Sequence, residues 1–101
     1  MREDLTPELF QAHLKSTFTS RLKDGSTTEF QLLSYEDLGS TPQQEQFSLV
    51  FYNPRQFVYP QGIYKLEHET AGTFELFLVP IKEQGAGIYY EAVFNRLKDS
   101  K

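Results

Sequence analysis

The chain has 101 residues, with 10 Lys and Arg against 14 Asp and Glu, so its formal net charge at pH 7 is -4. This length supports one modest hydrophobic core, and we expect a single domain over residues 1–101. The absence of cysteine excludes disulfides, thiolate metal sites and cysteine nucleophiles, so nine Phe and six Tyr are the main packing material.

A short helix is predicted near the N-terminus. Thr6 suits the N-cap, Pro7 suits the first helical position, and Glu8 places an acid in the first turn. Over residues 7–15 the side chains at helical spacing form one apolar stripe, made of Leu9, Phe10, His13 and Leu14. We expect this stripe to pack on a sheet, with His13 as an amphipathic residue at the contact rather than a proton-transfer group.

From Thr17 onward, apolar side chains recur at every second position, which is typical of β-strands. A turn at Asp24-Gly25 predicts a hairpin between the first two strands. The later strands are predicted at residues 47–52, 63–68, 74–79 and 88–95. Both faces of the strand at 74–79 are apolar, so we expect the helix to cover its second face. Pro80 should end that strand or form a bulge.

One helix followed by six short strands predicts a mainly β fold. The helix covers about residues 7–15, the β body about residues 17–95, and a polar tail residues 96–101. The hairpin-length turns indicate a six-stranded antiparallel meander. The pattern leaves open whether this meander forms a small barrel or a two-layer sandwich.

Membranes and nucleic acids are not expected partners. The longest apolar run, at residues 76–79, is far shorter than the roughly 18 residues that a membrane helix needs. The charged residues 1–7 do not resemble a signal peptide, so we expect a cytoplasmic location. Residues 27–95 hold three basic and nine acidic side chains, a net charge of -6, which repels phosphate groups.

The sequence offers few residues for catalysis. Glu67-His68-Glu69 has metal-ligating side chains, but on an extended strand His68 points away from both glutamates. Without a bulge the three cannot meet, and we interpret His68 as a hydrogen-bonded residue at the core edge. Glu36-Asp37 also lie on opposite faces and make a poor acid–base pair. We therefore expect no catalytic residue, no metal ligand and no cofactor, hence no enzyme.

One segment does not follow the alternation. Phe57, Val58 and Tyr59 precede Pro60, and they either pack as an irregular edge or protrude as anchors for a protein partner. A sugar or an apolar ligand would instead stack on Tyr52, Tyr59 or Tyr89 where these rings face outward.

Several motifs, in order along nearly the whole chain, resemble a bacterial domain family of unknown function. They are EDLG at residues 36–39, FSLVF at 47–51, PQGIYKLEHE at 60–69, GTFELFLVPI at 72–81 and YEAVFN at 90–95. The resemblance carries no catalytic mechanism. It implies an accessory or assembly part beside proteins similar to phage tail-collar fibres.

These observations favour a non-catalytic structural or protein-interaction domain, and the resemblance implies an accessory part of a tail-fibre-like assembly. Its anchors would be Phe57, Val58 and Tyr59, buried in a groove of a protein partner. The alternative is a small ligand-binding β domain for a saccharide or an apolar molecule, with Tyr52 and Tyr89 as stacking residues. The identity of the partner and the oligomeric state stay open.

Overall fold

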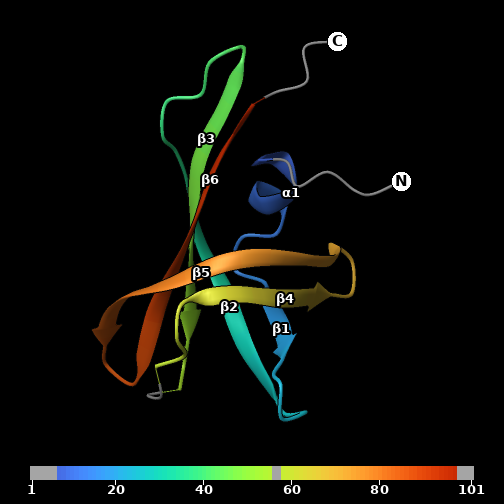
Figure 1. The fold of residues 1–101 in the computed structure, drawn as a ribbon, viewed down its shortest axis with the longest axis vertical. Coiled ribbons are helices and arrows are strands. Elements are labelled where there is room, and N and C mark those ends of the chain that lie inside the picture. Colours follow the sequence, from blue (N-terminus) through green and yellow to red (C-terminus); the bar gives the residue numbers. More distant parts are fainter. Residues whose placement is uncertain (1–6, 56–57, 98–101) are drawn as a thin grey trace.

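The computed structural model describes residues 7–55 and 58–97, and it confirms a mainly β fold with one short helix (Figure 1). The helix is α1 (Pro7–Ala12). The strands are β1 (Thr17–Arg21), β2 (Thr27–Asp37), β3 (Gln44–Asn53), β4 (Gly62–His68), β5 (Gly72–Gln84) and β6 (Gly87–Leu97). Within these described ranges, no helix has the length and apolar character to cross a membrane.

All six strands belong to one antiparallel sheet, in the order β1-β2-β3-β6-β5-β4. β4 also pairs with β1, through Thr19↔Glu67 and Ser20↔Leu66, so every strand has two neighbours. A simple meander would place β4 beside β3, but β3 pairs with β6 along its whole length instead. Pro54 follows β3 directly and Pro60 precedes β4; because proline has no N–H for a ladder, the chain leaves the sheet between these strands.

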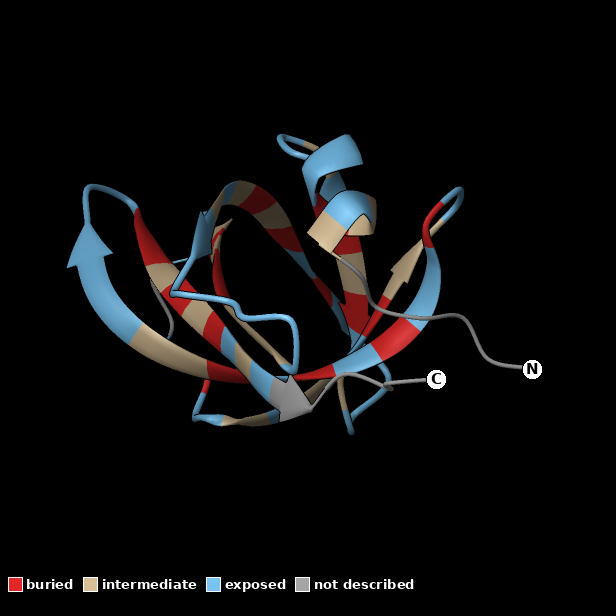
Figure 2. Ribbon diagram, turned by 90° about the horizontal axis from the view of Figure 1, so that it is seen from above, coloured by how far each residue is buried: buried red, intermediate tan, exposed pale blue. Residues whose placement is uncertain are grey.

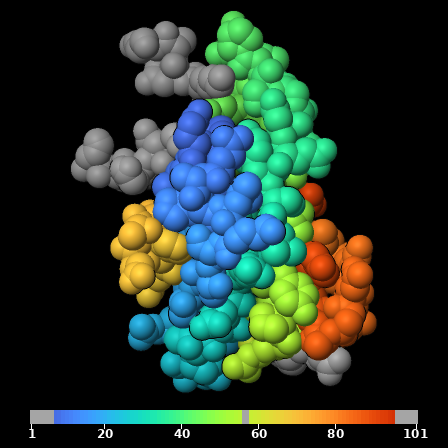
Figure 3. Space-filling view, turned by 180° about the vertical axis from the view of Figure 1, so that it is seen from behind, coloured from blue at the N-terminus to red at the C-terminus, as the bar shows by residue number. Residues whose placement is uncertain are grey.

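The helix is shorter than the predicted range of residues 7–15, because a turn replaces its last part. The His13 N–H donates to the Phe10 carbonyl at 3.0 Å, and the Ser16 N–H donates to the His13 carbonyl at 3.1 Å. Lys15 between them has a φ of 75°, which is incompatible with a continuing right-handed helix. Its N–H then bonds the Leu32 carbonyl at 2.6 Å, which fixes the end of the turn to β2. Figure 3 shows α1 and β1 in blue beside the teal residues of β2.

The core lies inside the sheet, where every second side chain of the strands points inward. Figure 2 shows this alternation as bands of buried and exposed residues along each strand. The fully covered apolar side chains are Phe10, Phe18, Phe30, Leu32, Phe47, Leu49, Phe51, Leu66, Leu78 and Tyr90. Phe10 brings α1 into this core, since its ring packs against Phe47, Phe74 and Phe94 at centroid distances of 6.1, 5.6 and 5.7 Å.

The outer face of β5 is open, and the expectation that α1 covers it is wrong. Phe77 on that face is 52% exposed, and Ile63, its partner on β4, is 69% exposed. The helix instead places its buried residue Phe10 against the inner face. β5 does bulge between Pro80 and Lys82, as the missing proline N–H predicts.

Candidate functional site

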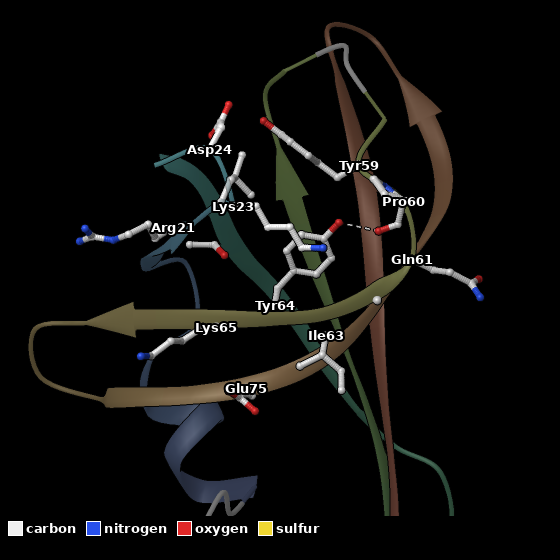
Figure 4. A pocket seen from close by; sticks show the side chains of 13 residues that line it. Arg21, Lys23, Asp24, Tyr59, Pro60, Gln61, Ile63, Tyr64, Lys65 and Glu75 are labelled. Atoms are coloured by element: carbon white, nitrogen blue, oxygen red, sulfur yellow. Dashed lines mark hydrogen bonds between the residues drawn. The ribbon is translucent and has the colours of Figure 1, made fainter. Parts of the chain in front are cut away.

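A pocket of about 660 Å³ lies between the β1–β2 turn and the chain that enters β4 (Figure 4). It is near the end of β1, whereas α1 precedes the start of that strand (Figure 1). Its lining combines aromatic, aliphatic and charged side chains with one buried hydroxyl. The lining residues are Ser20, Arg21, Leu22, Lys23, Asp24, Tyr59, Pro60, Gln61, Gly62, Ile63, Tyr64, Lys65 and Glu75.

One wall of the pocket is the tight turn between β1 and β2. The Asp24 carboxylate accepts hydrogen bonds from the Ser26 N–H at 3.0 Å and from the Ser26 hydroxyl at 2.6 Å, and these bonds lower the pKa of Asp24. Gly25 adopts a φ of 90°, a conformation that glycine accepts readily. The Leu22 N–H closes the turn on the Ser26 carbonyl at 2.7 Å. The turn therefore holds Lys23 in a defined place beside the pocket.

The opposite wall is the segment that enters β4, and two tyrosine hydroxyls fix it. The Tyr59 N–H donates to the Tyr90 hydroxyl oxygen at 2.8 Å, which ties the segment to the core. The Tyr64 hydroxyl donates to the Pro60 carbonyl at 2.5 Å. Burial is the largest cause that raises the pKa of both Tyr64 and Tyr90, so both phenols stay neutral near pH 7.

Ser20 provides a polar group in the pocket that the fold does not use. Its side chain is 1% exposed, and its hydroxyl is buried with no hydrogen-bond partner among the described residues. Its neighbour across the β1–β2 ladder, Thr28, differs, because the Thr28 hydroxyl accepts from the Asn53 side-chain amide at 2.9 Å. An unpaired buried hydroxyl is costly, so the Ser20 hydroxyl is an unsatisfied polar group in the wall of the pocket.

The charged lining residues are three basic and two acidic, but their side chains are not equivalent. Figure 4 shows Lys23 reaching from the turn across the pocket mouth in front of Tyr64, while Arg21 and Gln61 extend away. Within the described part of the chain, Lys23 forms no hydrogen bond and no ion pair.

The structure separates the residues that the sequence singled out. Phe57 lies outside the described residues, Val58 is 46% exposed, and Tyr59 is only 6% exposed. Tyr59 thus packs into the core edge and lines the pocket instead of protruding as an anchor. Tyr52 and Tyr89 contact each other at a centroid distance of 5.2 Å, as partners of β3 and β6, and neither lines the pocket.

Sequence reasoning missed Ser20, Lys23 and Tyr64 as members of one site. Each carries a weak signal on its own: Ser20 is a polar residue at an inward position, Lys23 lies in a turn, and Tyr64 lies near the start of a strand. Only the pairing of β1 with β4 brings these positions together, and no local pattern in the sequence shows that pairing.

The histidines lie elsewhere and serve the fold. The His68 Nδ1 accepts from the backbone N–H groups of Thr70 and Ala71 at 3.0 and 3.1 Å, which closes the β4–β5 turn. The His13 ring meets the His68 ring at a centroid distance of 4.8 Å. Among residues 7–55 and 58–97, no three His, Cys, Asp or Glu side chains are grouped so that they would hold a metal ion.

The fold and the pocket together define a small antiparallel β domain with a ligand-sized site at one end of its sheet. Residues 5–94 match a family model described as a domain of unknown function (DUF6916), so the chain belongs to that family. No curated protein and no solved structure matches the chain significantly. The family confirms the expectation of a domain of unknown function and adds no activity.

Proposed function

We propose that this protein is a non-catalytic domain that binds a small molecule in the pocket between the β1–β2 turn and the start of β4. The buried, unpaired Ser20 hydroxyl carries this proposal, because it is a buried side-chain group of the pocket that has no hydrogen-bond partner among the described residues. A ligand oxygen or N–H in the pocket would form the missing hydrogen bond with this hydroxyl. A volume of about 660 Å³ is typical of small-molecule sites, which range from about 300 to 1,000 Å³.

The lining favours a saccharide over a wholly apolar molecule. Tyr64 uses its hydroxyl on the Pro60 carbonyl, so its ring face is what it can offer to a ligand. The apolar face of a sugar ring packs on such aromatic surfaces, while its hydroxyls need polar partners. Ser20 and Lys23 provide these partners. An apolar molecule would leave the Ser20 hydroxyl unpaired.

Among the described residues, the pocket lining contains no pair of a histidine and a carboxylate set up for hydrolysis. Its lining residues include no histidine, and the Asp24 carboxylate is already engaged by Ser26. Glu75, the other acid, is an exposed residue of β5 and points away from Tyr64 in Figure 4. No acid–base pair therefore faces a bound ligand, which supports a binding role without catalysis.

The test uses a variant, Gly62→Leu, that fills the pocket without straining the backbone. A Cβ built on Gly62 meets no atom within 4 Å, and the φ of Gly62 lies outside the left-handed region, so Gly62→Leu adds a side chain into open space. Titration of the ¹⁵N-labelled protein with methyl β-glucoside and with cyclohexanol should shift the amides of residues 20–24 and 59–65 to saturation. The Gly62→Leu variant should retain the fold and lose these shifts.

The control is Gly25→Ala in the β1–β2 turn, on the opposite wall, where a Cβ meets no atom within 4 Å. Because Gly25 has a positive φ, this change strains the turn and lowers stability without filling the pocket. Saturable shifts that survive Gly62→Leu, or a wild-type protein in which no probe saturates any of these amides, would show that the pocket is not a binding site.

A second candidate function is protein interaction through the outer face of β4 and β5. Ile63 and Phe77 are cross-strand partners there and are 69% and 52% exposed. Val93, on β6, is 58% exposed. Such an apolar face favours a protein contact. An accessory part of a tail-fibre-like assembly would use a face of this kind. The double variant Ile63→Ser and Phe77→Ser should lose partners that the wild-type protein captures from its host and should keep its melting temperature.

Bacterial origin and a cytoplasmic location stay predictions from the sequence. The anchor role of Val58 also stays a prediction, and its 46% exposure is compatible with a partner contact.

A further inference from the structure

We propose that the ligand carries a carboxylate, that Lys23 binds this carboxylate at the mouth of the pocket, and that the protein therefore prefers an acidic sugar to its neutral counterpart. This inference rests on the proposed function and names the ligand class for the same site. Its basis is the charge and the position of the side chains around the pocket.

The pocket has a local excess of positive charge on an acidic protein. The whole chain has a net charge of -4, whereas the pocket lining contains three basic residues, Arg21, Lys23 and Lys65, and only two acidic residues. The two acids are also poorly placed to neutralise a lysine inside the pocket. Asp24 is held by two hydrogen bonds from Ser26, and Glu75 is the register partner of Lys65 on β4.

Lys23 is the basic residue that the fold places over the pocket. Figure 4 shows its side chain in front of Tyr64, whereas Arg21 and Lys65 extend away from that ring. Lys23 has no hydrogen bond or ion pair in the described part of the chain. A lysine ammonium group donates three hydrogen bonds and accepts none, so an anionic oxygen is its best ligand partner.

The two unpaired polar groups lie at different depths. The Ser20 hydroxyl is buried in the lining, and Lys23 is exposed at the mouth. A molecule that satisfies both needs a hydroxyl or similar group at one end, an apolar ring face for Tyr64, and a negative group at the other end. A sugar acid such as glucuronate has these three features.

A carboxylate suits this site better than a phosphate. Phosphate sites in proteins use arginine forks, backbone N–H groups at helix N-termini, or several cations together. Here Arg21 is turned away, and Lys23 is the one basic side chain that Figure 4 shows in front of Tyr64. The larger charge of phosphate would also be repelled more strongly by the acidic residues of the β body.

The experiment compares matched probes on the wild-type protein and two variants. Methyl β-glucoside, glucuronate and glucose 6-phosphate are titrated into the labelled protein at 150 mM NaCl, where charges beyond about 8 Å are largely screened. We expect glucuronate to bind roughly fivefold more tightly than methyl β-glucoside, the size of effect that one partly exposed ion pair supports. Lys23→Gln should make the two affinities equal, and Lys23→Glu should reverse the preference.

The matched control is Lys82→Gln, which removes the same charge from a β5 residue that does not line the pocket. This variant should keep the full preference for glucuronate. A preference that survives Lys23→Gln, or that Lys82→Gln also removes, would overturn the inference. Tighter binding of glucose 6-phosphate than of glucuronate would overturn the carboxylate assignment.

The outcomes also separate this inference from the proposed function. Saturable binding of methyl β-glucoside and glucuronate with equal affinity refutes the carboxylate site and leaves the proposed pocket intact. A failure of all three probes to saturate any amide of residues 20–24 and 59–65 refutes both. Lys23 is an exposed turn residue, so the variants should unfold at the wild-type temperature and their binding can be compared directly.

Discussion

Replacing Ser20 by alanine should make the protein more stable, although it removes a hydrogen-bonding group. The Ser20 hydroxyl is buried without a partner among the described residues, and a buried polar group in that state costs about 1–3 kcal/mol. We expect Ser20→Ala to raise the free energy of unfolding by about 1 kcal/mol, or the melting temperature by roughly 4–8 °C for a domain of this size.

Thr28 is the matched comparison, because it lies opposite Ser20 in the β1–β2 ladder and is equally buried. Its hydroxyl accepts a hydrogen bond from the Asn53 amide at 2.9 Å. Thr28→Val preserves the shape of the side chain but leaves that amide unpaired, so it should lower the free energy of unfolding by about 1–3 kcal/mol. Two neighbouring hydroxyl deletions should therefore change stability in opposite directions.

Urea unfolding followed by circular dichroism measures both changes, provided that the slope of the transition is the same in all three proteins. Ser20→Ala should also weaken binding of methyl β-glucoside in the titration described above. The reasoning is refuted if Ser20→Ala lowers the free energy of unfolding by about 1 kcal/mol or more, as we expect for Thr28→Val. The Ser20 hydroxyl would then be hydrogen-bonded within the fold.

Two further predictions concern the tyrosines and a tight glycine. Gly87→Ala should lower the free energy of unfolding by about 1–3 kcal/mol, because a Cβ there would overlap the Asn53 carbonyl and the Tyr52 ring; a thermal melt equal to that of the wild type would contradict this packing. Burial raises the pKa of Tyr64 and Tyr90, so their neutral forms stabilise the folded state fully below about pH 10, and this stability is lost as the pH rises through the raised values. Urea midpoints should fall above pH 10, and midpoints that rise there would contradict the assignment.

The alternation of side chains in the sequence was enough to predict most of the fold. Phe47, Leu49 and Phe51 recur at every second position, and all three are fully buried on β3. This works because a strand with one buried face must alternate. The alternation also holds on β5, where Leu76 and Leu78 are buried, but the expectation that the outer apolar side chains are covered failed, because Phe77 is exposed. Apolar character alone does not tell whether a second face is covered.

The pocket was beyond prediction for a different reason. Ser20 and Tyr64 lie on β1 and β4, and these strands meet only because the sheet returns on itself through the β1–β4 pairing. A pairing between strands so far apart in the chain leaves no local pattern in the sequence. Tyr59, which the sequence suggested as an anchor for a partner, is buried instead, since a small core uses each aromatic side chain that it can reach.

The most direct test of the account is a crystal structure of the protein with glucuronate. We predict the sugar between the β1–β2 turn and the start of β4, with one of its oxygens within hydrogen-bond distance of the Ser20 hydroxyl and its carboxylate on Lys23. A pocket that holds only water at saturating glucuronate, or a sugar bound at another place, would contradict the central claim that this site exists to bind a ligand.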